Sequence, residues 1–211
     1  MSYQASRARA FSKRQGPTWL KSWVWNWEFR NGKWDYLEEG REPNPFYETM
    51  ERLLVGGRLL DVACGTGVVR CFLAPEVLSR YVGVDISRAA TRRAEERVVG
   101  RPSIPEGDSF VTGDITDPAV RAKVGSDFNL ILFKECIYYV PVDDVPALLN
   151  SMSNLLAADG RILFQIHDRE RWAAHVSAIR ASLRVIEEMP SMDNKSVLLV
   201  AHPRIPGRSL K

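Results

Sequence analysis

The stretch Arg58-Leu-Leu-Asp-Val-Ala-Cys-Gly-Thr-Gly-Val68 joins a short apolar run to a glycine turn. The apolar residues among 59–63 show no helical periodicity, which is typical of a strand buried on both faces of a sheet. Gly65 and Gly67 lack a Cβ, so the chain can turn tightly there and a ligand can approach the backbone closely. Apolar residues at helix-like spacing follow over residues 68–73. Strand, glycine turn and helix form the first unit of a nucleotide-binding α/β sheet, whose ligand lies outside the carboxyl end of the strand.

Three kinds of ligand compete for this turn. A phosphate-binding P-loop ends in Gly-Lys-Ser/Thr, but this chain continues with Val68-Val69-Arg70, so the P-loop is excluded. A dinucleotide-binding turn has a third small residue for close helix–strand packing, and Arg70 stands at that position. S-adenosylmethionine (SAM) has no phosphate to hold, so two glycines suffice. Asp61, at the end of the strand, could orient the turn and the ammonium group of that ligand.

The segment resembles the first motif of class I SAM-dependent methyltransferases, whose pattern is hydrophobic-Asp-hydrophobic-Gly/Ala-x-Gly-x-Gly. Ala63 stands where the first glycine is commonest, which is a frequent variant. The resemblance covers roughly residues 42–168 and a closing hairpin. It implies an α/β three-layer sandwich with a mainly parallel seven-stranded sheet, the last strand antiparallel. It also implies SAM as the cofactor and S-adenosyl-L-homocysteine (SAH) as its product.

Two further predicted strands end in an acid. Asp85 closes the second, 18 residues after Gly67, near the ~20-residue separation at which a carboxylate reaches ribose hydroxyls. Residues 109–115 are the third predicted strand, which ends in Asp114-Ile115. In the family, the matching acid accepts a hydrogen bond from the adenine amino group. Aspartate is also common at helix caps and strand ends, but three acids at successive strand ends favour a binding site. The predicted cofactor-binding residues are Trp34, Asp61, Ala63, Cys64, Gly65, Gly67, Asp85, Ile86, Asp114, Ile115, Phe133 and Lys134.

The predicted fourth strand, residues 127–133, and the loop after it resemble the family's fourth motif. Asn129 stands where Asp is usual, and Lys134 replaces a small residue. The resemblance places this loop beside the transferable methyl group. His167, after the predicted fifth strand, has an ordinary pKa near 6.5 that suits a general base, although a histidine there is often only a helix cap. The catalytic candidates are His167, Glu135 and Tyr138, and the substrate-binding candidates are Trp27, Tyr36, Lys134, Tyr139, Arg169 and Arg171.

The N-terminal residues 1–41 are expected to form a basic tail and a Trp-rich cap or lid on a methyltransferase domain of residues 42–211. Trp19, Trp23 and Trp27 are spaced to share one helix face, which we expect to pack across the top of the core. In the family, the segment before the first strand usually covers the site. Trp34 and Tyr36 are therefore expected to contact the sulfonium or the acceptor through cation–π attraction worth ~0.5–2 kcal/mol.

The remaining pattern predicts an alternation of helices and strands. Ser87 is expected to cap a helix over residues 89–99 that exposes a charged face. The other expected helices are 46–54, 142–158 and 170–181; a turn at Asp159-Gly160 precedes a strand over 161–166, and residues 183–186 and 197–201 form the closing hairpin.

Composition limits the classes of function. At 211 residues, with 45% hydrophobic and 26% charged residues, the chain matches one ordinary globular domain that buries about 70% of its unfolded surface. No apolar run approaches the ~20 residues that span a bilayer, so no membrane partner is expected. The three cysteines have no paired spacing, which predicts no disulfide or metal framework and fits a cytoplasmic location. A net charge of +3 does not indicate nucleic acid.

These observations favour a SAM-dependent methyltransferase that acts on a small-molecule acceptor as a monomer or homodimer. We expect transfer to oxygen rather than nitrogen, and Lys134, Arg169 and Arg171 suggest an anionic acceptor. One alternative is an RNA methyltransferase that uses residues 7–33 as a basic, aromatic arm. Another is a SAM-binding protein without catalysis. A dedicated catalytic residue is not required, because alignment of the reactants supplies most of the effect.

Overall fold

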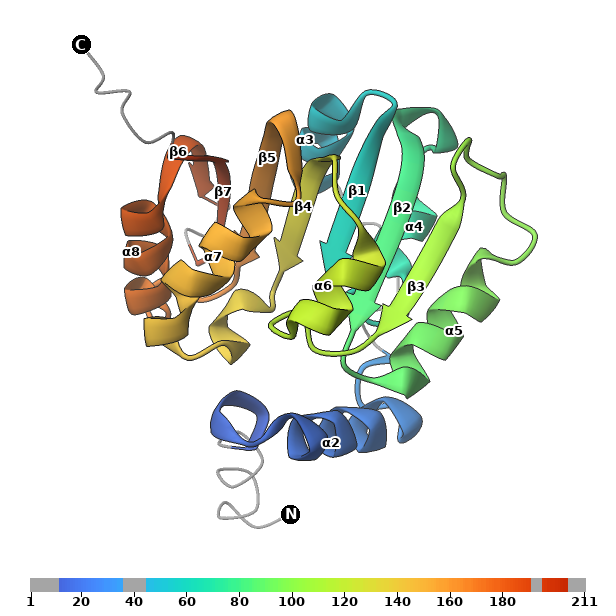
Figure 1. Cartoon of the computed structure of the whole chain (residues 1–211), viewed down its shortest axis with the longest axis horizontal. Coiled ribbons are helices and arrows are strands. Elements are labelled where there is room, and N and C mark those ends of the chain that lie inside the picture. Colours follow the sequence, from blue (N-terminus) through green and yellow to red (C-terminus); the bar gives the residue numbers. More distant parts are fainter. Residues whose placement is uncertain (1–11, 36–44, 191–194, 205–211) are drawn as a thin grey trace.

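The computed structural model describes residues 12–35, 45–190 and 195–204 of the chain. Its centre is a seven-stranded sheet with the order β3-β2-β1-β4-β5-β7-β6 (Figure 1). Strands β1 to β5 pair in parallel, and β7 runs antiparallel to both β5 and β6, as the sequence predicted. The strands are β1 (Gly57–Val62), β2 (Leu78–Asp85), β3 (Asp108–Thr112), β4 (Phe128–Lys134), β5 (Leu156–Ile166), β6 (Leu183–Pro190) and β7 (Val197–Pro203).

Helices cover both faces of the sheet. Apolar residues of α6, α7 and α8 pack in one core cluster on one face, and those of α3 and α4 pack in another on the opposite face. The helices are α2 (Thr18–Arg30), α3 (Pro45–Leu54), α4 (Val68–Phe72), α5 (Arg88–Val98), α6 (Pro118–Val124), α7 (Val145–Ser153) and α8 (Ala173–Ser182). None of the helices in the described ranges is long and apolar enough to cross a membrane.

Strand β1 is buried on both faces, as its apolar run predicted. Leu60 and Val62 belong to one core cluster, and Leu59 belongs to the other. Asn129 joins β4 to β1, because its Oδ1 accepts a hydrogen bond from the Arg58 amide at 2.9 Å. An amide oxygen therefore serves as the acceptor at a position where the family more often has an aspartate.

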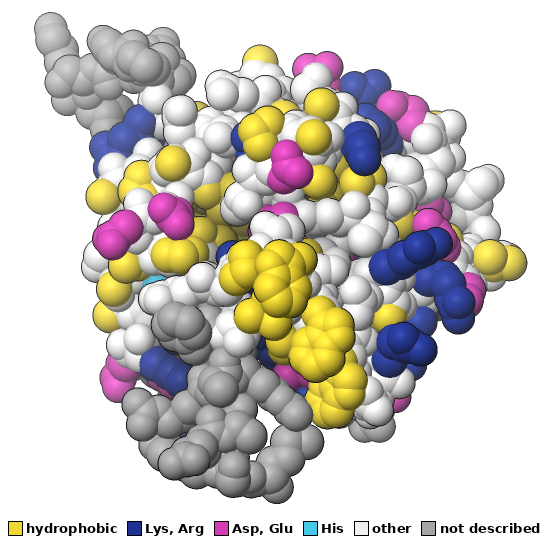
Figure 2. All heavy atoms as spheres, turned by 60° about the horizontal axis from the view of Figure 1, so that its bottom comes forward, with side chains coloured by type: hydrophobic (Ala, Val, Ile, Leu, Met, Phe, Trp, Pro, Cys, Tyr) yellow, Lys and Arg dark blue, Asp and Glu magenta, His cyan; other side chains and the backbone are white. Residues whose placement is uncertain are grey.

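Helix α2 lies across the carboxyl ends of the parallel strands (Figure 1). The expectation that Trp19, Trp23 and Trp27 pack on the core was wrong for the first two. Trp19 is 70% exposed and Trp23 is 63% exposed, and the large apolar side chains on this face are visible from outside (Figure 2). The opposite side of the helix faces the sheet, with Val24 and Phe29 buried.

Several boundaries differ from the sequence prediction. The expected helix over 142–158 is shorter: a 3-10 turn at Val142–Asp144 precedes α7, and β5 begins at Leu156. The expected turn at Asp159-Gly160 lies inside β5, where the pairing with β4 is irregular. A Cβ on Gly160 would come within 2.6 Å of the Phe128 carbonyl oxygen, so glycine is needed there for close strand contact.

The remaining predicted elements are confirmed within a few residues. Helix α8 begins at Ala173 rather than 170, and β3 ends at Thr112 rather than 115. The Ser87 side chain caps α5 by accepting from the Ala90 amide, and Arg92 pairs with Glu96 at 3.2 Å on the exposed face of that helix. The connection between the two strands of the closing hairpin lies partly outside the described residues.

Candidate active site

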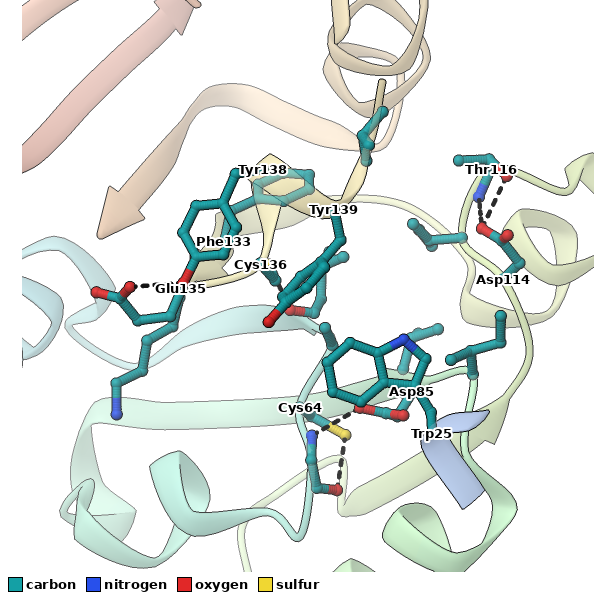
Figure 3. Close-up of a pocket in the computed structure, with 18 of the residues that line it drawn as sticks. Trp25, Cys64, Asp85, Asp114, Thr116, Phe133, Glu135, Cys136, Tyr138 and Tyr139 are labelled. Atoms are coloured by element: carbon teal, nitrogen blue, oxygen red, sulfur yellow. Dashed lines mark hydrogen bonds between the residues drawn. The ribbon is translucent and has the colours of Figure 1, made fainter. Parts of the chain in front are cut away.

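A cavity of about 1110 Å³ lies at the carboxyl ends of β1, β2 and β4, beneath α2. The turn after β1, the loops after β2, β3 and β4, and side chains of α2 line it. Figure 3 shows residues of these elements around one open space, with Trp25 and Tyr139 reaching into it from α2 and from the loop after β4. The volume lies slightly above the range of about 300–1,000 Å³ that is common for ligand pockets.

The glycine turn forms one wall of this cavity. Ala63 has φ of 57°, the left-handed region that glycine adopts without strain, which explains why the family has glycine there more often. Gly65 has φ of 56° and lines the cavity; a Cβ there would meet only the Phe29 ring, at 3.6 Å. Gly67 was predicted to bind the cofactor but does not line the cavity. Glycine makes room there for Ala94 of α5, because a Cβ on residue 67 would lie only 3.0 Å from the Ala94 Cβ.

Asp85 lies at the end of β2, only 6% exposed, and lines the same cavity. Its carboxylate accepts from the Gly65 amide at 3.0 Å and from the Ser87 amide at 2.8 Å. Burial raises the pKa of Asp85 to about 6, and these two amide hydrogen bonds act in the opposite direction. Ile86, the next residue, also lines the cavity.

Asp61 is 1% exposed and accepts a hydrogen bond from the Tyr81 hydroxyl at 2.6 Å. Burial raises the pKa of Asp61 to about 7. Lys134, at the end of β4, has a lowered pKa, chiefly through burial, and its ammonium lies 5.3 Å from the centre of the Phe46 ring. Asp61, Cys64, Phe133 and Lys134 all line the cavity.

Asp114 and Ile115 follow β3 and also line the cavity. Asp114 Oδ1 accepts from the Thr116 amide at 3.0 Å and from the Thr116 hydroxyl at 2.7 Å, a local turn visible in Figure 3. This is the local structural role that an aspartate at a strand end often has. The structure thus brings the predicted cofactor residues to one cavity, with Gly67 as the exception.

Of the three predicted catalytic residues, Glu135 contacts both of the others, and all three line the cavity. Glu135 Oε2 accepts from the Tyr138 hydroxyl at 2.9 Å and from the His167 backbone amide at 3.0 Å. Glu135 has φ of 55°, an uncommon conformation for a residue with a Cβ and one that clusters at functional sites. Burial raises the pKa of Glu135, against the lowering effect of these two hydrogen bonds. The His167 ring is exposed, and its Nδ1 lies 3.0 Å from the Ser196 hydroxyl.

The predicted substrate-binding residues separate into two groups. Tyr139 and Lys134 line the cavity, whereas Trp27, Arg169 and Arg171 do not. Arg171 lies against Trp172, with its guanidinium 4.9 Å from the ring centre, and so does not reach the cavity. Tyr36 lies outside the described residues.

Sequence reasoning missed Trp25, which lines the cavity together with Trp34. The rings of Trp25 and Trp34 are 5.6 Å apart, and Trp25 meets Tyr139 edge to face at 4.9 Å. The available signal was the i,i+4 pair of Trp25 and Phe29, which shares a helix face in the same way as the exposed tryptophans.

Polar residues of α2 fix this orientation. Asn26 Oδ1 accepts from the Ser87 hydroxyl at 3.0 Å and from the Ala89 amide at 2.9 Å, at the start of α5. Ser22 donates to the Ile86 carbonyl at 3.2 Å. Helix α2 therefore contacts the loop that follows Asp85, and the cover of the cavity is tied to one of its walls.

Comparisons with known proteins agree with this geometry. A family model described as a methyltransferase domain matches residues 27–203. Phosphoethanolamine N-methyltransferase of Triticum aestivum is 25% identical over 143 residues, which cover 65% of this chain and 27% of that protein; the match thus spans about a quarter of the relative's length.

Solved structures share the fold. The N-methyltransferase NodS from Bradyrhizobium japonicum in complex with SAH aligns with a TM-score of 0.61 at 20% identity, over 86% of this chain and 99% of that chain. A TehB-like SAM-dependent methyltransferase from Corynebacterium glutamicum aligns with a TM-score of 0.61 at 20% identity, over 84% of this chain and 97% of that chain. The chain belongs to the methyltransferase-domain family and has the fold of class I SAM-dependent methyltransferases.

Proposed function

We propose that the cofactor lies along the carboxyl ends of β1, β2 and β3. The residues there fit a ligand with a ribose and no phosphate. Asp85 presents a buried carboxylate to the cavity, which suits a pair of ribose hydroxyls, and Gly65 leaves space for close approach to the backbone. Ile86 and Ile115 offer apolar surface for the adenine ring.

When bound, SAM supplies a methyl group on a positively charged sulfur, and transfer breaks that carbon–sulfur bond and leaves SAH. The chain's own residues contribute alignment and exclusion of water. Well-oriented reactants gain ~7–11 kcal/mol in this way. Trp25 and Tyr139, which reach into the cavity from opposite sides, are suited to both tasks.

We infer that Glu135 accepts the proton that the acceptor releases. Its carboxylate is held by Tyr138 and by the His167 amide, and its raised pKa makes it a stronger base than an ordinary glutamate. The sequence favoured His167 as the base. His167 and Ser196 also line the cavity, but the His167 ring is exposed and contacts Ser196, so the buried Glu135 is the better candidate.

The acceptor, on our proposal, is a small molecule that is methylated on nitrogen. The supporting observation is the lining of the cavity next to the glycine turn. The rings of Trp25, Trp34 and Tyr139 and the Glu135 carboxylate line this part of the cavity, which we call the chamber. Rings and a carboxylate attract a cationic amine, and the rings already hold the ammonium of Lys13. The names of the phosphoethanolamine N-methyltransferase and of NodS point in the same direction. The sequence-based preference for oxygen stays a prediction that the assay below tests.

Methyl transfer from labelled SAM to matched acceptors tests this proposal. The panel contains small primary amines, the corresponding alcohols and phenols, carboxylic acids, and total RNA. We expect label only in the amines, with activity that depends weakly on salt. Label confined to oxygen acceptors would contradict the assignment to nitrogen. Transfer to RNA with a steep salt dependence would replace the small-molecule acceptor altogether.

A further inference from the structure

An ammonium group of the chain itself occupies the aromatic part of the cavity. Lys13 lies in a helical turn over residues 12–15 and is only 7% exposed. Its Nζ lies 3.8 Å from the centre of the Trp25 ring, 5.0 Å from that of Trp34 and 5.8 Å from that of Tyr139. We call these three rings the aromatic cage. A cation within about 6 Å of several ring centres is attracted by each of them.

Glu28 supplies a negative charge beside the cage. It is fully buried and binds Lys13 Nζ at 2.5 Å, Lys33 Nζ at 2.7 Å and Trp34 Nε1 at 3.0 Å. Burial raises the pKa of Glu28, but the hydrogen bonds and charges of the two lysines outweigh burial and leave the pKa below its usual value. Glu28 is therefore ionised and helps to hold the cage through Trp34.

The charges of this cluster do not balance. Glu28 carries one negative charge, while Lys13 and Lys33 carry two positive charges. Lys33 alone neutralises Glu28, so the ammonium in the cage can be exchanged for another cation without leaving a buried charge unpaired. Lys33 is half-exposed and lies 5.2 Å from the centre of the Trp34 ring, whereas Lys13 is buried and lies within 6 Å of all three ring centres.

The cage is continuous with the cofactor cavity. Lys13, Trp25, Trp34 and Tyr139 line the same space as Gly65 and Asp85. Tyr139 comes from the loop that also carries Glu135 and Tyr138, the residues we assign to proton transfer. A cation held by the cage would thus lie in the chamber that adjoins the transfer site.

We propose that the aromatic cage is a subsite for an alkylated ammonium group of the acceptor, and that Lys13 fills it in the absence of acceptor. This inference rests on the small-molecule methyltransferase activity proposed above and names its substrate class: amines that remain cationic as methyl groups are added. A quaternary ammonium suits such a site because its charge is attracted by the rings. It also has no N–H donor, so the rings leave no hydrogen bond unsatisfied.

Removal of Lys13 tests the subsite. The Lys13→Ala variant and the wild-type protein are titrated with choline and with its uncharged isostere 3,3-dimethylbutan-1-ol, and binding is followed by calorimetry and tryptophan fluorescence. We expect the variant to bind choline about tenfold more tightly than the wild type does, and to bind it more tightly than the isostere. Lys123→Met, which removes an exposed positive charge outside the cavity, should bind choline as the wild type does.

Equal affinity of Lys13→Ala for choline and the isostere, or no gain over the wild type, would overturn the proposal. Wild-type protein provides a second measurement if Lys13→Ala fails to fold. The wild-type protein should bind choline weakly but saturably, and Trp25→Leu should abolish that binding. Choline binding that Trp25→Leu leaves unchanged would also overturn the proposal. Calorimetry with SAH distinguishes a failure of the proposed function from a failure of the aromatic-cage proposal. Absence of SAH binding contradicts the proposed function, whereas SAH binding without choline binding contradicts only the cage.

Discussion

At the scale of single residues, Asp85 links the fold to the proposed cofactor site. Its carboxylate closes β2, fixes the glycine turn through the Gly65 amide and fixes the start of α5 through the Ser87 amide. Its position after a buried strand was enough to predict its place at the sheet edge. Its second role as an anchor for the Gly65 amide was not predictable, because that contact depends on how two crossover connections meet.

The pKa of about 6 for Asp85 predicts a pH-dependent affinity for SAH. Because the ionised carboxylate accepts hydroxyl hydrogen bonds better, the contribution of Asp85 to affinity should rise with pH up to about 6, changing by up to about tenfold per unit below that pH. Asp61 lines the same cavity with a pKa of about 7, so any rise that remains in Asp85→Asn between pH 6 and pH 7 belongs to Asp61. Asp85→Asn should bind SAH roughly 10–100-fold more weakly, since hydrogen bonds to a charged group contribute about 1.5–3 kcal/mol.

Calorimetry with SAH between pH 5 and pH 8 measures both effects. Asp117→Asn is the matched control, because Asp117 caps α6 and does not line the cavity. It should follow the wild-type curve. An unchanged pH profile in Asp85→Asn would exclude Asp85 as the group that titrates.

At the scale of elements, the glycine turn separates two functions. Gly65 faces the cavity, whereas Gly67 allows α4 and α5 to pack closely. The sequence motif treats both glycines as binding residues, since spacing along the chain does not show which one faces a ligand. Arg70 likewise has a packing role: it is buried, bonds Asp108 at 2.5 Å and the Pro102 carbonyl at 3.1 Å, and ties α4 to β3.

Gly67→Ala should lower the free energy of unfolding more than Gly100→Ala does. Both glycines have positive φ, 73° and 77°, so both variants carry the strain of a left-handed conformation, about 1 kcal/mol. Only Gly67 has a neighbour in the way, the Ala94 Cβ at 3.0 Å, and nothing lies within 4 Å at Gly100. The overlap should add about 1–3 kcal/mol.

Urea denaturation of the two variants measures the difference. Folded Gly67→Ala should still bind SAH, because Gly67 does not line the cavity. A stable Gly67→Ala protein that has lost SAH binding would assign Gly67 to the cofactor after all.

Helix α2 shows why its orientation escaped sequence analysis. Two aromatic stripes at helical spacing compete on it, and the exposed stripe contains more tryptophans than the buried one. The choice depends on Ser22 and Asn26, which bond the loop after β2 and the start of α5. Partners more than 60 residues away in the chain cannot be identified from periodicity.

Asn26→Ala should loosen α2 from the sheet edge. The variant loses the hydrogen bonds from the Ser87 hydroxyl and the Ala89 amide, which together contribute about 1–3 kcal/mol. Hydrogen exchange of α2 amides should accelerate accordingly, and SAH affinity should fall. Asn31→Ala is the matched control, since the Asn31 side chain donates to the Trp27 carbonyl at the exposed end of the same helix. Equal exchange rates in the two variants would contradict the role of Asn26.

At the scale of the whole molecule, the sheet was predictable because its strands are buried runs that end at glycines and acids. The three-layer architecture and the antiparallel last strand followed from the family resemblance and are present. The start of β5 was missed because pairing with β4 outweighed the local turn signal at Asp159-Gly160. The Glu28 cluster was missed because its partner Lys13 lies 15 residues earlier, beyond any helical spacing.

A crystal structure of the protein with SAH bound would show whether the cavity at the carboxyl ends of β1, β2 and β3 holds the cofactor. We expect the ribose hydroxyls within hydrogen-bond distance of the Asp85 carboxylate and the adenine between Ile86 and Ile115. The sulfur should face the part of the cavity that Trp25, Tyr139 and Glu135 line. SAH bound elsewhere, or with its sulfur turned away from that chamber, would contradict this placement.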